Sequence, residues 1–263
     1  MDCMICAGRM LLYFSKEFDS SVLGRVEYHR CDGCGFCASK THQDMPEADW
    51  VRLNTEWHEA NNRRAENPWG REKRHFNQAL MLHLLSRHGL APEGCWLDYA
   101  SGQAGLSKQL RVQFGEELYS FDKFIRPESL PILESDLQKR NYNLVVNTAM
   151  FEHVRDRATL DEVESYVAEE GCLAVHTLVR GEIPADPDWM YLLPVHCAFF
   201  TNRSMDILMR QWGYSCSIYS EQAKMWIWFK TEPGMVARKA AALNKSLGWE
   251  YLHFKQGFMD YWP

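Results

Sequence analysis

The chain has 263 residues, of which 46% are hydrophobic and 24% charged, a globular composition that excludes a disordered or collagen-like protein. Its 29 Lys and Arg face 35 Asp and Glu, a net charge of −6, whereas non-specific binders of nucleic acid or anionic membranes usually carry a basic excess. The sequence contains neither an apolar run of the ~18 residues that a membrane span needs nor an N-terminal signal pattern. We therefore expect a cytoplasmic protein with no membrane partner.

The N-terminal segment is rich in cysteine, since five of the nine cysteines lie in the first 37 residues. Cys3 and Cys6 form one C-x2-C pair, and Cys31 and Cys34 form a second. Two such pairs suit a tetrahedral Zn²⁺ ion, and four thiolates leave no open position for a substrate. We therefore predict a structural zinc on these four residues. Cys37 is an alternative to one of the four, and free thiols are the alternative to a metal.

The turns around the two pairs should need a residue that tolerates positive φ just after the second cysteine. Gly35 and Gly8 are the candidates. Strand-like runs at 10–14 and 25–30 would form a small ribbon between the pairs, which predicts a zinc-binding domain over residues 1–45. Four single cysteines elsewhere are predicted to be small buried hydrophobic residues: Cys95, Cys172, Cys197 and Cys216.

Two helices are predicted over residues 46–90, which we assign as a helical linker or substrate-side helices. The first covers 48–65 and is polar. The second covers 72–88, where Phe76, Leu80 and Leu84 recur at helical spacing, and Gly89 ends it.

The centre of the chain alternates between strands and helices. A strand at 95–99 leads into a loop of small residues and then into a helix, a geometry that lets a ligand approach the backbone closely. Asp122 closes the next strand, 17 residues after Gly105, near the ~20-residue offset of ribose-binding acids. Strands at 142–148 and 171–179 follow. This alternation predicts an α/β fold with a parallel sheet and helices on both faces, while the loop alone leaves NAD, FAD and S-adenosylmethionine (SAM) open.

The segment 69–230 resembles the class I SAM-dependent methyltransferases. Residues 97–105 look like the D-x-G-x-G-x-G signature, and 143–154 look like the strand-plus-"leHv" segment. Residues 196–213 resemble a stretch of the branch that methylates sugars, quinones and natural products, some members of which carry an N-terminal zinc ribbon. The resemblance implies a Rossmann-like sheet closed by a C-terminal antiparallel hairpin, over a SAM-binding domain at 91–232.

The signature departs from the family at two positions. Ala100 and Ala104 stand where the first and third glycines are expected. Because alanine resists positive φ, we expect either a reduced affinity for SAM or a different path of the loop.

The resemblance also implies roles for individual residues. The backbone of 100–102 would meet the methionine part of SAM, Asp98 would organise the loop, and Asp122 would accept from the ribose. Asp136 and Leu137 would meet the adenine, and Asn147 and Thr148 would line the cofactor. These residues are, in the order of the chain, Asp98, Ala100, Ser101, Gly102, Asp122, Asp136, Leu137, Asn147 and Thr148. A solvated Asp136 is the alternative at that position.

Two histidines are predicted to be catalytic, because an alcohol or phenol acceptor has to lose a proton that an imidazole can take. His153 and His196 fall in family segments that face the cofactor cleft. The alternatives are that His153 packs or caps at a helix start and that His196 fixes the loop 181–195 by a hydrogen bond. Glu152 precedes His153 directly, and adjacent helical residues do not face each other, so we do not predict a dyad.

The C-terminal region is predicted to contain a hairpin at 214–221 and 225–230, a helix at 233–247 and an aromatic tail at 248–263. We assign 233–263 as a C-terminal helix and tail. The tail could pack on its own domain, on the ribbon or on a second subunit, which leaves a homodimer open.

Taken with the resemblance, these features predict a SAM-dependent methyltransferase of a small-molecule or sugar-containing acceptor, methylated at oxygen. One alternative is an RNA or protein methyltransferase that reads its substrate with the ribbon. The net charge opposes a nucleic-acid partner, and the basic cluster is limited to Arg63, Arg64, Arg71, Lys73 and Arg74. A second alternative, motivated by Ala100 and Ala104, is a non-catalytic scaffold with the same fold.

Overall fold

The computed structural model describes residues 2–20, 22–63 and 68–260, which divide into two compact units. Unit 1 comprises Met1–Asn67, Phe151–Leu160 and Leu178–Leu208. Unit 2 comprises Pro68–Met150, Asp161–Thr177 and Met209–Pro263. Neither unit is continuous in sequence. Two segments of the predicted domain at 91–232 group with the N-terminal residues, and these segments carry Glu152, His153 and His196.

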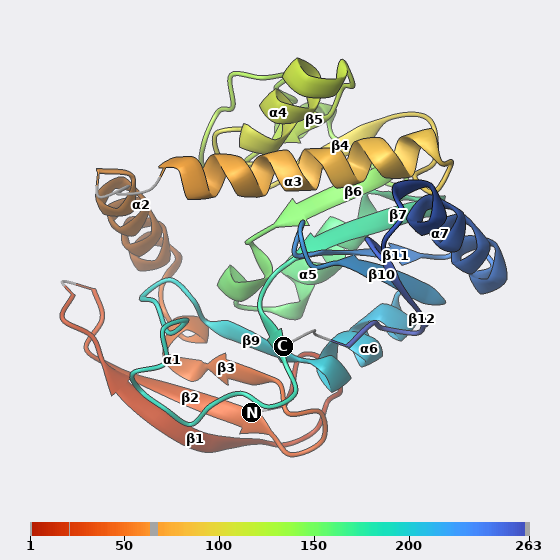
Figure 1. Cartoon of the computed structure of the whole chain (residues 1–263). Coiled ribbons are helices and arrows are strands. Elements are labelled where there is room, and N and C mark those ends of the chain that lie inside the picture. Colours follow the sequence, from red (N-terminus) through yellow and green to blue (C-terminus); the bar gives the residue numbers. More distant parts are fainter. Residues whose placement is uncertain (1, 21, 64–67, 261–263) are drawn as a thin grey trace. The chain divides into compact units, whose positions relative to one another are not determined.

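Unit 1 contains a five-stranded sheet with the order β1-β2-β3-β9-β8 (Figure 1). The strands are β1 (Met10–Glu17), β2 (Arg25–Cys31), β3 (Cys37–Ser39), β8 (Val179–Arg180) and β9 (Ala198–Thr201). The first two form the predicted antiparallel ribbon, with a bulge between Leu12 and Phe14. β3 joins the ribbon to β9, whose residues lie about 160 positions later in the chain. Pairs this distant in sequence leave no local pattern, which is why the sequence does not predict them.

Two helices follow the ribbon in unit 1, α1 (Lys40–Gln43) and α2 (Glu47–Arg63). The second one confirms the helix predicted at 48–65, apart from residues 64 and 65, which lie outside the described residues. The core of the unit packs Tyr28 of β2, Trp50 of α2 and Phe199 of β9 against the aliphatic side chains of the loop before β9. This packing holds three segments that are distant in sequence in one unit.

Unit 2 contains a seven-stranded sheet with the order β12-β10-β11-β7-β6-β4-β5. Its strands are β4 (Trp96–Tyr99), β5 (Tyr119–Phe121), β6 (Tyr142–Thr148), β7 (Val167–His176), β10 (Cys216–Ser220), β11 (Met225–Phe229) and β12 (His253–Gln256). The first four are parallel, and the hairpin β10–β11 continues the sheet antiparallel to β7. The predicted α/β sheet with a C-terminal antiparallel hairpin is confirmed.

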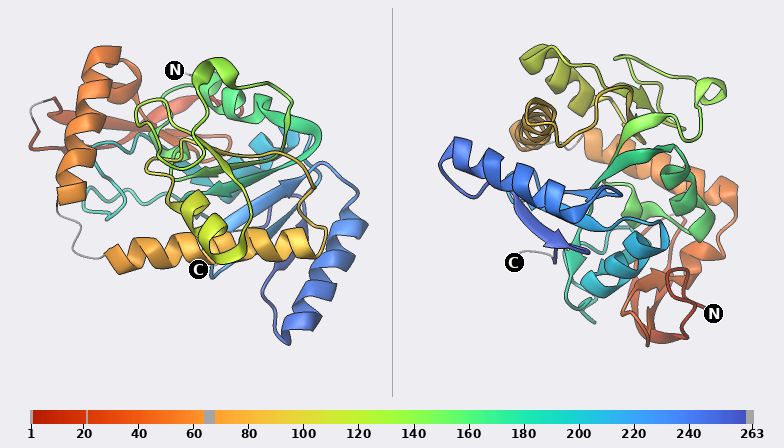
Figure 2. Two further views of the ribbon diagram at one scale, coloured as in Figure 1. Left: turned by 90° about the horizontal axis from the view of Figure 1, so that it is seen from above. Right: turned by 90° about the vertical axis from the view of Figure 1, so that its right-hand side faces the viewer.

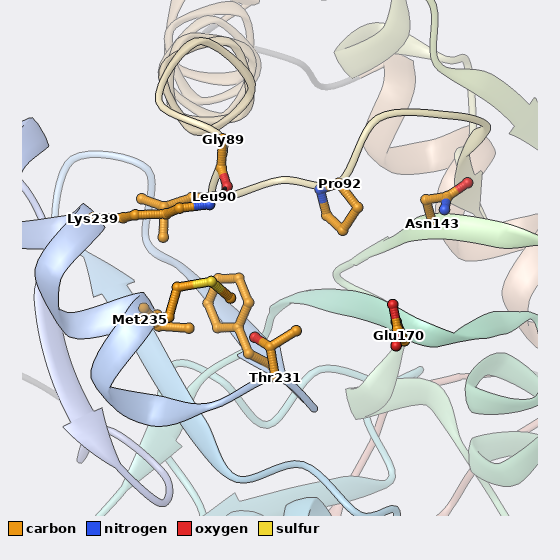
Figure 3. Close-up of a pocket in the computed structure, with 10 residues that line it drawn as sticks. Gly89, Leu90, Pro92, Asn143, Glu170, Thr231, Met235 and Lys239 are labelled. Carbon is orange, nitrogen blue, oxygen red and sulfur yellow. Dashed lines mark hydrogen bonds between the residues drawn. The ribbon is translucent and has the colours of Figure 1, made fainter.

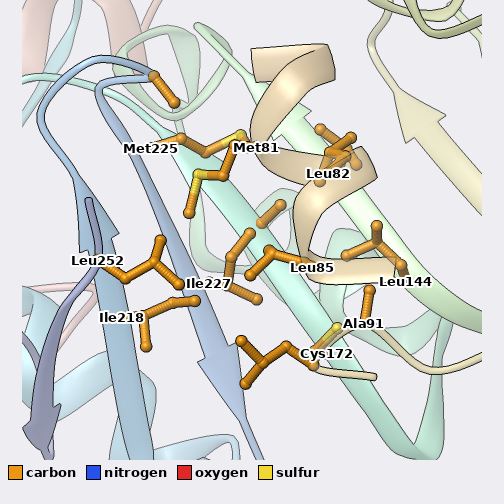
Figure 4. Close-up of a cluster of buried hydrophobic side chains, with 14 of the residues drawn as sticks. Met81, Leu82, Leu85, Ala91, Leu144, Cys172, Ile218, Met225, Ile227 and Leu252 are labelled. Carbon is orange, nitrogen blue, oxygen red and sulfur yellow. The ribbon is translucent and has the colours of Figure 1, made fainter. Parts of the chain in front are cut away.

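Three helices pack on one face of this sheet, α3 (Pro68–Arg87), α4 (Gly105–Phe114) and α7 (Pro233–Leu247). Met81, Leu82 and Leu85 of α3 point toward Leu144 and Ile227 of the sheet (Figure 4). Helices α5 (Arg157–Ser165) and α6 (Asn202–Gln211) each cross the boundary between the units. Two single turns, η1 (Glu134–Asp136) and η2 (Phe151–His153), complete the elements.

Helix α7 matches its predicted bounds because its end signals are local. The Glu232 side chain accepts from the amides of Gly234 and Met235, Pro233 occupies the first turn, and Gly248 ends the helix at a φ of +77°.

The aromatic tail packs on unit 2, one of the three alternatives that the sequence leaves open. β12 pairs antiparallel with β10 and lies beside α7 (Figure 2). Tyr251 and Phe258 are buried, and the Nε1–H of Trp226 donates to the carbonyl oxygen of Met259. Tyr261 and Trp262 of the tail lie outside the described residues.

One predicted core residue is not buried. Cys95 is exposed immediately before β4, whereas Cys172, Cys197 and Cys216 are buried as predicted. The apolar run of the strand begins at Trp96, so Cys95 belongs to the turn that precedes it. Among the described residues, no helix is both long and apolar enough to cross a membrane.

Candidate functional site

The loop that follows β4 reverses the chain through three residues in the left-handed region. Ala100, Gly102 and Ala104 have φ of 62°, 55° and 55°. The two alanines therefore adopt the conformation of the glycines that they replace, at a strain of roughly 1–2 kcal/mol each. Gly102 is positioned by a hydrogen bond of 2.8 Å from its N–H to Oδ2 of Asp122.

Asp122 organises this loop, a role that the resemblance assigns to Asp98. Besides the amide of Gly102, its carboxylate accepts from the N–H groups of Phe124 and Ile125, each at 2.9 Å. Asp98 is instead only 1% exposed, and its Oδ1 has no hydrogen-bond partner in the described part of the chain. Burial, together with the nearby charge of Asp122, raises the pKa of Asp98 to about 8. Asp98 is therefore mostly protonated at neutral pH.

Three buried oxygen atoms gather at the carboxyl ends of β4 and β6. They are Oδ1 of Asp98, Oγ of Ser101 and Oδ1 of Asn147, and none has a partner among the described residues. The side-chain amide of Asn147 donates to the carbonyl oxygen of Tyr99 at 3.0 Å, which fixes Asn147 beside the end of β4. Buried polar atoms without partners are rare in native proteins and call for a ligand or ordered water. Hydroxyl and amino donors, such as those of SAM, fit these acceptors.

His75 of α3, which the sequence analysis does not single out, packs over the start of α4. A Cβ atom built on Gly105 would lie 2.3 Å from Nδ1 of His75 on α3. Gly105 is therefore required for space, and the imidazole covers the first turn of α4. Burial lowers the pKa of His75 to about 4, so that the ring is neutral. The sequence does not predict this contact, because it depends on how two helices pack. The one hint in the sequence is a histidine within the helical pattern of residues 72–88.

The remaining predicted cofactor residues lie in different surroundings. Thr148 is half-buried at the end of β6, directly after Asn147. Asp136 is exposed in η1, where its carboxylate accepts from the hydroxyl of Ser135. Leu137 is half-buried. A cavity of about 230 Å³ in unit 2 borders Leu90, Asn143 and Met235 and includes none of the predicted cofactor residues (Figure 3).

The four predicted zinc ligands of unit 1 converge into one cluster, which we call the four-cysteine group. Cys3 and Cys34 have Sγ atoms 3.7 Å apart, and those of Cys6 and Cys31 are 3.4 Å apart. A zinc–sulfur distance of about 2.3 Å in a tetrahedron requires sulfur atoms about 3.8 Å apart. The thiol of Cys34 holds the pKa of Cys3 down to about 5 through their hydrogen bond. The donor set and its spacing therefore fit Zn²⁺.

The turns around the four-cysteine group match the prediction at one of two positions. Gly35 has a φ of +76°, as expected, but on the other side Ala7 adopts positive φ in place of Gly8. Gly8 is needed for space, because a Cβ there would lie 3.0 Å from Sγ of Cys31. Cys37 is buried on β3 and pairs with Phe199, outside the four-cysteine group.

The two predicted catalytic histidines also meet in unit 1. The ring centroids of His153 and His196 are 4.9 Å apart, with the ring planes at 84°. Together with Glu152 they form a group whose candidate ligand atoms all lie within 4.8 Å of one another. Adjacency argued against a role for Glu152 beside His153, but that argument assumed an α-helix. The segment is a single tight turn, η2, and brings both side chains into the group.

Tyr191 contacts two members of this group and was not predicted as a site residue. Its hydroxyl donates to Oε1 of Glu152 at 2.8 Å, and its carbonyl oxygen lies 2.9 Å from Nδ1 of His196. The second contact is the loop-fixing hydrogen bond that was the alternative for His196. Burial lowers the pKa of His153 to about 3 and also lowers the pKa of His196.

The solved structures that are similar to this chain include the following three. A SAM-dependent methyltransferase of Thermotoga maritima, described as a possible histamine N-methyltransferase, is 13% identical, with 69% of this chain and 98% of that chain covered and a TM-score of 0.42. The magnesium protoporphyrin IX methyltransferase of Synechocystis is 14% identical, with 63% and 88% covered and a TM-score of 0.42. The plantazolicin methyltransferase BamL is 14% identical, with 77% and 89% covered and a TM-score of 0.48.

The comparison with curated proteins finds no match. A family model described as a methyltransferase domain matches residues 71–217, which is more than half of the chain and includes β4, the loop after it, Asp122 and β6. The chain therefore belongs to the methyltransferase-domain family and is a SAM-dependent methyltransferase.

Proposed function

We propose that this enzyme transfers the methyl group of SAM to an oxygen atom of a small-molecule or sugar-containing acceptor, with a structural Zn²⁺ at the four-cysteine group. The observation that carries the cofactor site is the set of three buried oxygens without partners on Asp98, Ser101 and Asn147. Leaving such atoms unpaired costs roughly 1–3 kcal/mol each, a cost that a bound cofactor would remove.

The cofactor would lie on the loop after β4. The backbone of 100–102 would meet its methionine part, and Asp122 would accept from the ribose while holding Gly102. Asn147 and Thr148 would line the cofactor at the end of β6. Asp136, which is exposed, and Leu137, which is half-buried, would meet the adenine.

The acceptor side is assigned to His153 and His196. An alcohol or phenol has to lose its proton before or during transfer. These imidazoles form a polar cluster with Glu152 in unit 1, in which Glu152 and His196 are buried and His153 is half-buried. Three residues, 149–151, separate Thr148 from Glu152 along the chain. The net charge of −6 favours a small acceptor over a nucleic acid.

Calorimetric titration of SAM into the purified protein, with Ser101→Ala as the decisive variant, tests the cofactor site. The Ser101 hydroxyl has no partner in the described protein, so its removal should leave the free energy of unfolding unchanged or slightly higher. The same change should weaken SAM binding about tenfold, because it removes one hydrogen bond to the cofactor.

Ser107→Ala is the matched control. The Ser107 hydroxyl donates to the carbonyl oxygen of Ala104 and accepts from the hydroxyl of Ser120, so this variant should lose stability and keep its SAM affinity. Asp122→Ala should lose both, since its carboxylate holds three backbone amides. If folded wild type binds no SAM, the scaffold alternative replaces the proposal.

Once SAM binding is established, the acceptor class can be tested by the release of S-adenosylhomocysteine with hydroxyl-bearing sugars and quinols, and with total RNA as the competing class. Turnover on RNA with a steep salt dependence would overturn the small-molecule assignment.

A further inference from the structure

Two segments far apart in sequence build the Glu152–His153–His196 group. Glu152 and His153 lie on η2, and His196 closes the long loop between β8 and β9. The amide of Cys197 donates to the carbonyl oxygen of Glu152 at 2.8 Å, and the Cys197 thiol lies 3.3 Å from the carbonyl oxygen of Val154. These contacts clamp the two segments together directly beside the three side chains, which keeps the group in place.

Hydrogen bonds from outside the group orient two of its three side chains. A carbonyl oxygen can only accept, so Nδ1 of His196 carries the proton that it donates to Tyr191, and the lone pair of the ring is on Nε2. The hydroxyl of Tyr191 fixes one carboxylate oxygen of Glu152. Metal-binding histidines usually donate their second ring N–H to a carbonyl or carboxylate in this way.

The burial of the group also suits metal binding. His196 is 7% exposed and His153 is half-buried, so both rings are largely shielded from water. Glu152 is 3% exposed and supplies a carboxylate oxygen.

We propose that Glu152, His153 and His196 bind a divalent first-row transition-metal ion. Two imidazoles and one carboxylate are a donor set that such ions accept, and three protein ligands leave coordination positions open. This site differs from the four-cysteine group, where four thiolates would surround a metal ion completely. The open positions would take a hydroxyl oxygen of a small molecule.

The use of this ion rests on the proposed function, whereas its binding does not. A bound ion would lower the pKa of a hydroxyl coordinated at one of the open positions, and the proton of that hydroxyl would pass to solvent water. The two histidines would then assist the loss of the acceptor proton by holding the ion, which is one way in which the role proposed for them could be carried out.

Titration with Mn²⁺, followed by electron paramagnetic resonance, tests the site in full-length protein already loaded with Zn²⁺. Manganese favours oxygen and imidazole ligands over thiolates, so it distinguishes this site from the four-cysteine group. We expect one Mn²⁺ per chain with magnetic coupling to imidazole nitrogen. Glu152→Gln and His196→Ala should each weaken binding at least tenfold.

His42→Asn is the matched control, because His42 is a buried histidine of the same unit whose ring nitrogens contact Ser39 and Pro194. It should bind Mn²⁺ like wild type. The proposal is overturned if wild type binds no Mn²⁺, if bound Mn²⁺ shows no coupling to nitrogen, or if Glu152→Gln binds Mn²⁺ as tightly as wild type. Because the nitrogen coupling is measured on wild type, it tests the proposal even if a variant fails to fold. SAM titration of the same samples tests the proposed function separately.

Discussion

The four-cysteine group of unit 1 and the loop after β4 of unit 2 share a backbone conformation but differ in whether their polar side-chain atoms have partners. Both turn through left-handed alanines, Ala7 in one and Ala100 and Ala104 in the other. In the four-cysteine group the reactive atoms face one another, with sulfur pairs 3.4 and 3.7 Å apart. In the loop, buried oxygens have no partner among the described residues.

This difference separates a site that serves the fold from a site that serves a ligand. The four-cysteine group surrounds its proposed ion, so binding energy becomes folding energy. The loop stores strain and unpaired polar atoms, which cost stability until a ligand supplies the missing contacts. Removing a sulfur atom of the four-cysteine group should therefore lower the stability of the fold, whereas removing an unpaired oxygen of the loop should weaken ligand binding.

The largest expected effect is on the four-cysteine group. Cys31→Ser should abolish zinc binding and destabilise unit 1 by several kcal/mol, because structural zinc sites contribute on the order of 10 kcal/mol of binding free energy. Zinc content and hydrogen exchange of β1 and β2 measure both effects. Cys37→Ala, a buried cysteine outside the group, should keep the zinc. Full zinc occupancy in Cys31→Ser would contradict the assignment.

The second prediction concerns pH and the buried acid of the loop. Asp98 has a folded pKa of about 8 and an unfolded pKa near 3.9, so between those values the unfolded state loses a proton that the folded state keeps. The stability of wild type should fall as pH rises through this window, by up to about 1.4 kcal/mol per pH unit from this group. Asp98→Asn removes that contribution, so its advantage over wild type should grow from pH 5 to pH 8.

Denaturant unfolding of both proteins across this window measures the difference. Asp136→Asn, at an exposed position, controls for the change in net charge. Parallel pH profiles for wild type and Asp98→Asn would show that Asp98 is ionised in the folded protein.

The smallest effects sharpen the comparison within the loop. Ala100→Gly relieves the strain of a φ of 62° at a half-buried position and should stabilise the protein by about 0.5–1 kcal/mol. Ala104→Gly relieves similar strain but removes a fully buried methyl group, worth about 0.8 kcal/mol, so the net change should be near zero. Ala241→Gly, exposed in α7, should cost about 1 kcal/mol. A loss of stability in Ala100→Gly would show that Ala100 is not strained in the folded protein.

The sequence by itself determined what short-range patterns control. Two C-x2-C pairs specify four thiolates, because each pair is one turn of chain. The bounds of α7 follow from Pro233 and Gly248, and the strand–loop–helix unit with Asp122 follows from periodicity and spacing. These features depend on neighbours within a few residues, or on one repeated offset, which a sequence records directly.

Only the tertiary structure decided which distant residues meet. It placed β3 beside β9, the tail strand β12 beside β10, His75 over Gly105, and Tyr191 and His196 around Glu152. It also placed Asp98 in a buried position and brought the carboxylate of Asp122 to three backbone amides of the loop region. Each of these outcomes depends on packing between segments tens of residues apart, and the burial that sets a pKa or leaves an oxygen unpaired does not exist until those segments pack.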